Sequence, residues 1–471
     1  MGKRRYGWLV SAVVAIAFVV SWLMGGAAQA QQSAQEEIDA IKKRVGQLEE
    51  KQKKAAWTEK LKFSGQIGLR TEYIANEDFN TDQDRWRQRA RLRFQTTYDV
   101  NEQFMAGFRL TTGDPKFPST GWENLGGGNT GADTTGAENS FSKFRVNFDR
   151  MWMTWKPNQT LKFSAGKFEL PFFKPQAIWG SGIWFDDDVQ PSGIAETINL
   201  PVGGALKSLR LTFGQFVLQE FRENISGINR GAGMFGQQIS GSLVPTPDVD
   251  VKFGLGFYLF DDTKRLARGA GGVSTIDSGA YNNHFTNRAL TAAGGASCSS
   301  GGLGGFTACD KFVSDYHLLN PSLQVDFKGG PYPVTFTVDY VNNLGAESDP
   351  LTKSGKKNNS VLGWLSMGST KDPGNWRLGY GYYYSQADSA LAMFVDDDYQ
   401  FTNVKSHMID FQYRIWKDVL LQWDTYIQRF EDSQLAGLQG LSVTGIAAGS
   451  GGPGFDNPTK MRSRISLLVN F

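Results

Sequence analysis

Apolar and polar side chains alternate along most of this chain, from Leu61 to Phe471. In the first segment one face carries Leu61, Phe63, Ile67, Leu69 and Tyr73, and the other carries Lys62, Ser64, Gln66, Arg70 and Glu72. The same pattern recurs at residues 104–110, 209–213, 251–259, 334–340, 376–384 and 461–471. Because successive side chains of a β-strand point to opposite faces, a period of two predicts strands with one apolar and one polar face. We therefore expect an all-β chain.

The connectors between these segments extend the prediction to a barrel. We count sixteen candidate strands, which begin near residues 61, 84, 104, 142, 160, 193, 207, 233, 249, 316, 332, 359, 374, 400, 417 and 460. Short connectors rich in Pro, Gly, Asn or Asp alternate with mostly long ones, as the periplasmic turns and outer loops of a membrane barrel do. The sequence therefore predicts a transmembrane antiparallel β-barrel of about sixteen strands, with both of its ends on the periplasmic side.

A soluble β-sandwich would show the same alternation and is the alternative fold. Aromatic residues near strand ends favour the membrane barrel, because Tyr and Trp gather at membrane interfaces. These residues are Tyr73, Tyr98, Trp155, Trp376, Tyr413 and Trp416. The last strand also places Ile465, Leu467, Val469 and Phe471 on one face. After residue 30 there is no long uninterrupted apolar stretch, which excludes a helical membrane protein.

The first thirty residues have the features of an export signal. Basic residues at 3–5 precede an apolar run at 8–24, and Ala-Gln-Ala at 28–30 is a cleavage site of the small-x-small type. An uncleaved membrane anchor is the alternative. Cleavage would remove three of the 49 Lys and Arg residues and none of the 47 Asp and Glu residues, which leaves a net charge of −1. Nucleic acid is therefore not an expected partner.

A polar, proline-free segment lies between the signal and the barrel. Its apolar residues Ala34, Ile38, Ile41, Val45 and Leu48 are spaced alternately four and three apart, which predicts a coiled coil, and Ile at both core positions favours trimers or higher states. Because two heptads are marginal, a single amphipathic helix on the barrel rim is the alternative. The expected organisation is a signal peptide at 1–30, a periplasmic coiled-coil helix at 31–56 and an outer-membrane barrel at 57–471.

Only two cysteines are present, Cys298 and Cys309. In an oxidising compartment they can form a disulfide that closes a small loop, and free or intermolecular thiols are the alternative. The chain has no Cys-x-x-Cys-His motif for haem, and the cysteines lack a nearby pair of histidines for zinc. We therefore expect neither a metal nor a cofactor.

The strongest local signal is a strand of arginines. At a period of two, Arg85, Arg87, Arg89, Arg91 and Arg93 share one face, while Trp86, Ala90, Leu92 and Phe94 share the other. Because arginine is costly in lipid, the basic face is expected to line the lumen, with Arg70 and Arg109 on neighbouring strands on the same side. Such a wall lowers the barrier for anions. In the alternative interpretation the arginines pair with acids and leave the pore weakly selective.

The connector at about 170–192 is expected to fold into the barrel. It contains Phe172, Phe173, Ile183, Trp184 and Phe185, which is too apolar for a solvated outer loop. Its charged residues Lys174, Asp186, Asp187 and Asp188 would then lie at a constriction. Acids on the loop that face arginines on the wall would set up a field that orients dipolar solutes. The alternative is an Asp cluster on a solvent-facing loop.

Catalysis finds little support in the sequence. The three histidines, His284, His317 and His407, are not part of a His-Glu-x-x-His pair, and there is no Gly-x-Ser-x-Gly elbow. A hydrolase built on a serine and His407 is the enzymatic alternative. We expect a protein that is not an enzyme and has no catalytic residues.

Several patches resemble the bacterial putative porin family, related in style to the phosphate-selective porins. They are the heptad helix, the arginine strand at 84–94, Asp149-Arg150-Met151-Trp152, Gly166-Lys167-Phe168 followed by Pro171-Phe172, Asp339-Tyr340-Val341 with Asn343, and residues 394–398. The resemblance implies a homotrimeric, sixteen-stranded diffusion channel in outer-membrane lipid, which passes small anions or polar solutes. It also implies an inward third loop at 170–190. Phosphate-selective members carry a lysine-rich loop cluster, whereas this connector offers only Lys167 and Lys174 beside three aspartates.

Two other functions are compatible with such a barrel. One is the sheath of an outer-membrane electron-transfer complex, which would co-purify with haem and conduct few ions. The other is a structural tether, in which the coiled coil acts and the barrel only anchors it.

Overall fold

A computed structural model describes the chain at residues 40–47, 58–76, 84–113, 119–126, 143–178, 180–219, 231–263, 287–291, 300–301, 305–306, 309–348, 355–399, 401–433 and 459–471. The expected signal peptide, most of the expected coiled-coil segment and Cys298 lie outside these residues. The structure separates residues 1–62 from residues 63–471 as two compact units. Within the first unit, residues 40–47 form a short helix. Among the described helices, none has the length and apolar character needed to cross a membrane.

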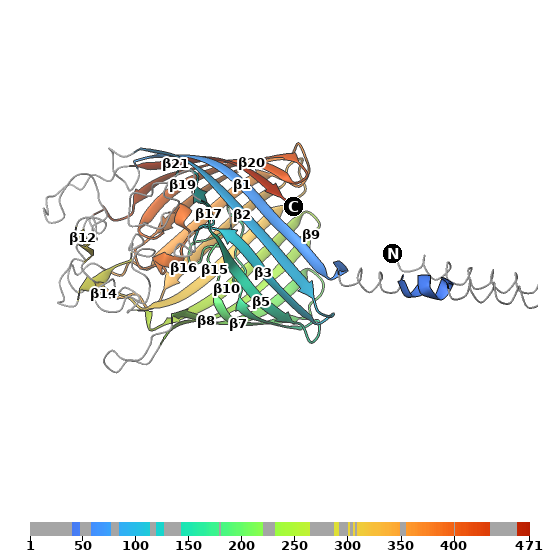
Figure 1. Ribbon diagram of the computed structural model, residues 1–471. Coiled ribbons are helices and arrows are strands. Elements are labelled where there is room, and N and C mark those ends of the chain that lie inside the picture. Colours follow the sequence, from blue (N-terminus) through green and yellow to red (C-terminus); the bar gives the residue numbers. More distant parts are fainter. Residues whose placement is uncertain are drawn as a thin grey trace, which may run out of the picture. The chain divides into compact units, whose positions relative to one another are not determined.

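Sixteen antiparallel strands form a closed barrel, as the sequence predicts (Figure 1). They are β1 (Leu61–Ala75), β2 (Arg85–Asp99), β3 (Phe104–Thr112), β5 (Val146–Trp155), β6 (Leu161–Lys167), β7 (Ser192–Leu200), β8 (Leu206–Gln219), β9 (Ala232–Thr246), β10 (Val249–Asp261), β15 (Tyr316–Phe327), β16 (Val334–Asn343), β17 (Asn359–Gly368), β18 (Trp376–Ser385), β19 (Val404–Trp416), β20 (Val419–Phe430) and β21 (Lys460–Asn470). The barrel closes where β1 pairs with β21, with Leu69 opposite Leu467.

Shorter elements lie outside this series. They are β4 (Glu123–Asn124), which extends the sheet beside β2, the pairs β11 (Ala289–Thr291) with β14 (Cys309–Phe312) and β12 (Ser300–Gly301) with β13 (Gly305–Phe306), and the 3₁₀ turns η4 (Ala392–Phe394) and η5 (Asp397–Tyr399). The connectors at one end of the barrel are short, such as 100–103 and 417–418, and those at the other end are mostly long, as predicted. Both ends of the strand series lie at the short-turn end, where Gly65 and Phe471 exchange backbone hydrogen bonds.

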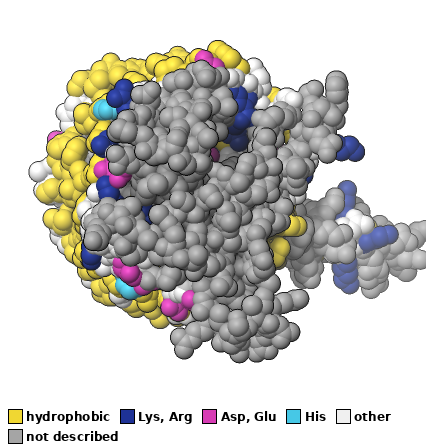
Figure 2. Space-filling model, turned by 90° about the vertical axis from the view of Figure 1, so that its left-hand side faces the viewer, with side chains coloured by type: hydrophobic (Ala, Val, Ile, Leu, Met, Phe, Trp, Pro, Cys, Tyr) yellow, Lys and Arg dark blue, Asp and Glu magenta, His cyan; other side chains and the backbone are white. Residues whose placement is uncertain are grey.

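The period-two pattern turns apolar side chains outward. Phe63 on β1, Met153 on β5 and Ile465 on β21 each expose more than half of their side-chain area. Figure 2 shows hydrophobic side chains along the outer surface of the barrel. In a bilayer this surface contacts lipid instead of water. Its apolar side chains are therefore in a favourable environment there, although they are exposed on the isolated barrel. Near the short-turn end, Trp155 and Trp416 are exposed where an interfacial aromatic belt is expected.

Two connectors fold into the barrel and occupy part of its interior. The first inward segment, residues 168–191 between β6 and β7, is the one that the sequence predicts. The second inward segment, residues 386–403 between β18 and β19, was not predicted. Together with side chains of the strand wall they form a buried apolar cluster, in which Phe185 stacks on Phe394 at 5.4 Å between ring centroids and Trp184 stacks on Tyr258 at 3.8 Å.

Backbone hydrogen bonds join the two inward segments. The Asp186 N–H donates to the Phe394 carbonyl at 2.6 Å, and the Asp396 N–H donates to the Gly182 carbonyl at 3.1 Å. Polar side chains of the wall hold the first inward segment as well. The Phe173 N–H donates to Gln238 Oε1 at 2.7 Å, and Ser181 Oγ donates to the buried Asp339 carboxylate. Because each contact satisfies a buried polar group, the first inward segment has a defined position inside the barrel.

Candidate functional site

A cavity of about 230 Å³ is lined by residues of the strand wall and of the two inward segments. It is lined by Arg70, Arg89, Arg91, Arg93, Arg109, Arg150, Ser119, Thr120, Trp122, Glu169, Asp186, Asp187, Asp188, Asp396, Asp397 and Asp398. All of the lining arginines come from the strands β1, β2, β3 and β5. All of the lining acids come from the two inward segments. The two signs of charge are thus carried by different parts of the fold and meet across the cavity.

The arginine wall follows from strand geometry. Arg89, Arg91 and Arg93 lie two residues apart on β2, so their side chains leave the same face of the sheet. Arg89 and Arg91 are each 6% exposed. The ring of Trp122, which precedes β4, contacts two arginines of the wall. The guanidinium carbon of Arg70 lies 3.9 Å from the ring centroid, and that of Arg91 lies 4.6 Å from it. These cation–π contacts fix the direction of the long arginine side chains.

The structure divides the predicted pore-lining arginines. Arg70, Arg89, Arg91, Arg93 and Arg109 line the cavity. Arg87 is not among the lining residues and forms an ion pair with Glu72 on β1. Arg85 lies in a separate hollow that also contains Trp86 and Asn124.

The first inward segment contributes the predicted acids to the cavity, whereas Lys174 of the same segment is not among the lining residues. Asp188 forms an ion pair with Arg93 and lies 3.9 Å from Arg91, so it links the segment directly to the wall. Lys174 forms an ion pair with Asp187 of the same segment. Glu169 adds a contact of 2.9 Å to Arg150 on β5.

The second inward segment brings a further acidic triplet that sequence reasoning missed. Asp398 forms an ion pair with Arg464 and lies 3.1 Å from Arg462, both on β21. A signal for this site exists in the sequence, because an apolar run followed directly by three aspartates occurs twice, at residues 183–188 and at 393–398. Because the second connector is shorter than the first, this repeated pattern was overlooked.

The local charges lower the pKa of some of these acids and raise the pKa of others. Burial alone would raise the pKa of Asp188, but Arg93 and Arg91 together hold it below its ordinary value. Burial likewise opposes the ionisation of Asp398, and Arg464 with Arg462 holds its pKa low. By contrast, burial and then the neighbouring acids raise the pKa of Asp186 and Asp396 well above the ordinary range. Burial, followed by Asp398, raises the pKa of Asp397 to about 6.

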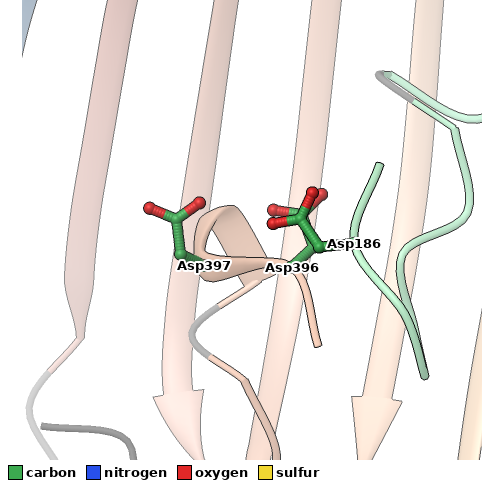
Figure 3. A group of neighbouring side chains, drawn as sticks. All are labelled: Asp186, Asp396 and Asp397. Carbon is green, nitrogen blue, oxygen red and sulfur yellow. The ribbon is translucent and has the colours of Figure 1, made fainter. Parts of the chain in front are cut away.

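Three of the acids lie close enough together to share one ligand. Asp186, Asp396 and Asp397 each bring a carboxylate oxygen within 4.8 Å of the others (Figure 3). Asp396 and Asp397 come from the second inward segment, and Asp186 comes from the first. Such a group can hold a cation, because carboxylate oxygens are ligands for hard metal ions and acceptors for ammonium groups. With the arginines opposite, the cavity can contact a positive and a negative group at the same time.

Neither of the described histidines, His317 and His407, lines the cavity, and His284 lies outside the described residues. Cys298 lies outside the described residues, and the side chain of Cys309 is not described. His407 is exposed on the outward face of β19, where its Nδ1 lies 2.8 Å from the hydroxyl of Tyr380.

Comparison with known proteins gives a family and a fold. A model of the putative porin family matches residues 73–426 of the chain. No curated protein matches the sequence.

The chain is also similar in fold to solved structures. OprB of Pseudomonas putida, determined at high pH, has 11% sequence identity and a TM-score of 0.51, and the match covers 87% of this chain and 94% of that one. An anion-selective porin from Comamonas acidovorans has 12% identity and a TM-score of 0.45, with 87% and 99% covered. OmpF of Salmonella typhi, in a complex with daunomycin, has 9% identity and a TM-score of 0.45, with 87% and 97% covered. At these identities the likeness to OprB shows the fold alone.

Proposed function

Since the chain belongs to the putative porin family and forms an outer-membrane channel, we propose that it admits small hydrophilic solutes and ions by passive diffusion, with a modest preference for anions. The family membership and the fold make it a channel rather than an enzyme. The observation that carries the finer proposal is the wall of lining arginines on one side of the charged cavity.

The balance of charge at the cavity supports a modest preference rather than a strong one. Among the residues that the structure describes, six arginines and seven acids line it. Burial and the neighbouring acids raise the pKa of Asp186 and Asp396, which weakens the negative side of the cavity relative to the arginines. The Nε atoms of Arg89, Arg91 and Arg93 are buried and have no hydrogen-bond partner among the described residues. They are buried donors on the basic side of the cavity.

The other parts of the proposal concern assembly and location. Residues 1–30 act as a cleaved signal peptide and residues 31–56 form a periplasmic coiled-coil helix. The barrel associates as a homotrimer in outer-membrane lipid, with a disulfide between Cys298 and Cys309 in an outer loop. Support for these statements comes from the sequence pattern and from the resemblance to porins.

The test is the reversal potential of the mature protein in planar bilayers under a KCl gradient. We compare it with a variant in which Arg89, Arg91 and Arg93 are replaced by Gln. Anion selectivity that falls in the variant supports the proposal. If the pore conducts and its selectivity is unchanged by the substitutions, the channel function stands but the arginine mechanism is wrong. That result would favour arginines that are neutralised by their neighbouring acids. If folded protein does not conduct, the sheath or tether becomes the better interpretation, and co-purifying haem absorbance separates those two.

A further inference from the structure

Positive and negative groups line the cavity on opposite sides. The arginines are held on strands and the acids on the inward segments. Apart from pairs such as Asp188 with Arg93, groups of opposite sign are therefore kept on separate elements of the fold. A simple anion or cation meets one favourable side and one unfavourable side. A solute that carries both charges can meet a favourable partner on each side.

The acidic side has room for a positive group. Asp186, Asp396 and Asp397 bring three carboxylate oxygens within 4.8 Å of one another (Figure 3). Asp186 is only 5% exposed, and its Oδ2 atom has no hydrogen-bond partner among the described residues. Its other oxygen, Oδ1, accepts the Asp188 N–H at 2.7 Å, which fixes the direction of the carboxylate. A buried acceptor that lacks a donor costs stability unless a ligand supplies one.

The basic side of the cavity has hydrogen-bond donors that lack an acceptor. Arg91 is 6% exposed, and its Nη2 atom donates to Gln66 Oε1 at 2.5 Å, but its Nε atom has no partner among the described residues. The Nε atom of Arg89 likewise has no partner among the described residues, while its Nη2 atom donates to the Trp122 carbonyl at 2.7 Å. Both side chains are thus held in place with a buried donor left over.

We propose that this cavity binds zwitterionic solutes of the amino-acid type, with the ammonium group among Asp186, Asp396 and Asp397 and the carboxylate at Arg89 and Arg91. The inference rests on the proposed channel function, because the cavity must be reached through the pore. An ammonium group has three N–H donors, which match three carboxylate oxygens. A divalent metal ion fits less well, because Arg89, Arg462 and Arg464 all act on Asp397 and would repel a double charge more strongly.

The experiment compares two isomers, L-alanine and lactamide, in liposome-swelling assays with the mature protein. They have the same atoms, but alanine is a zwitterion and lactamide is neutral. We expect alanine to enter about threefold faster, the size expected from one partly exposed ion pair on each side. In the variants Asp186→Asn/Asp397→Asn and Arg91→Gln the advantage of alanine should fall to near one. The matched control is Asp248→Asn/Asp418→Asn, which removes two acids from exposed short turns and should keep the advantage.

The outcomes separate this inference from the proposed function. KCl conductance is measured for the wild-type protein and for every variant. If the folded wild-type protein does not conduct, the proposed channel function is wrong. Normal conductance with equal rates for alanine and lactamide would overturn only the zwitterion site. An advantage that the control variant also loses would point to net charge and overturn the local assignment. An advantage that disappears with about 1 mM CaCl₂, a concentration that fills weak carboxylate sites, would assign the three aspartates to a metal ion instead.

Discussion

Replacing Asp188 by Asn should make the channel more selective for anions. The side chain keeps its size and loses one charge, which is present at neutral pH because Arg93 and Arg91 outweigh the effect of burial and hold the pKa of Asp188 below its ordinary value. Asp188 is the acid that forms the ion pair with Arg93 and lies 3.9 Å from Arg91. Its removal leaves two cations of the wall with less compensation.

The magnitude follows from Coulomb's law. For an ion that passes about 5 Å from the removed charge in a water-filled pore with a dielectric constant of about 80, the interaction is about 0.8 kcal/mol. Salt at about 0.1 M, with a screening length of about 10 Å, reduces this to about 0.5 kcal/mol. Chloride gains this free energy and potassium loses it. The ratio of anion to cation permeability should therefore rise by about fivefold, since 1.4 kcal/mol corresponds to a factor of about ten.

The assay is the reversal potential in a KCl gradient, with Arg93→Gln as the mirror variant. That substitution removes the partner cation and should move selectivity toward cations by a similar factor. If both variants shift the potential in the same direction, or if neither shifts it, the ion path does not pass between Asp188 and Arg93 and the reasoning fails.

Three further predictions concern the inward segments and the wall. Trp184 is fully buried and stacks on Tyr258, so Trp184→Ala should weaken docking of the first inward segment by about 3–5 kcal/mol and give larger, noisier single-channel currents. Acidification from about pH 7.5 to about pH 5 should increase anion selectivity, because Asp397, with a pKa raised to about 6 by burial and by Asp398, loses its negative charge. Arg464→Gln should lower the thermal stability of the folded barrel by about 3–5 kcal/mol, because the buried Asp424 and Asp398 lose their partner.

Each of these has a check of its own. Unchanged current in the Trp184 variant would show that the segment does not limit the pore. The pH response involves every charged group that faces Asp397, namely Arg89, Arg462, Arg464, Asp186, Asp396 and Asp398. Of these the arginines stay charged and the pKa of Asp398 is held low, so Asp397→Asn should reduce the response, and an undiminished response would assign it elsewhere. For the wall, adding Asp424→Asn to Arg464→Gln should restore part of the stability, and no recovery would contradict a role of buried charge.

The sequence determined the barrel and the basic wall because both depend on a local rule. Side chains two residues apart share a face of a strand, so the alternation from Leu61 to Phe471 predicts sixteen strands whose starts lie within a few residues of those observed. The same rule places Arg89, Arg91 and Arg93 together on the inner face. The apolar character of the connector at about 170–192 was also enough to predict that it folds inward.

Only the tertiary structure decided which charges meet. Arg462 pairs with Glu72 across the closure of the barrel, and Arg464 pairs with Asp398 from the second inward segment. These partners are distant in the chain, and their contact depends on barrel closure and on the packing of Phe394 against Phe185. Strand periodicity is a property of neighbouring residues, whereas the position of an inward segment depends on side chains from many strands at once. For that reason the sequence by itself reveals the arginine face, and the folded barrel reveals the acids that oppose it.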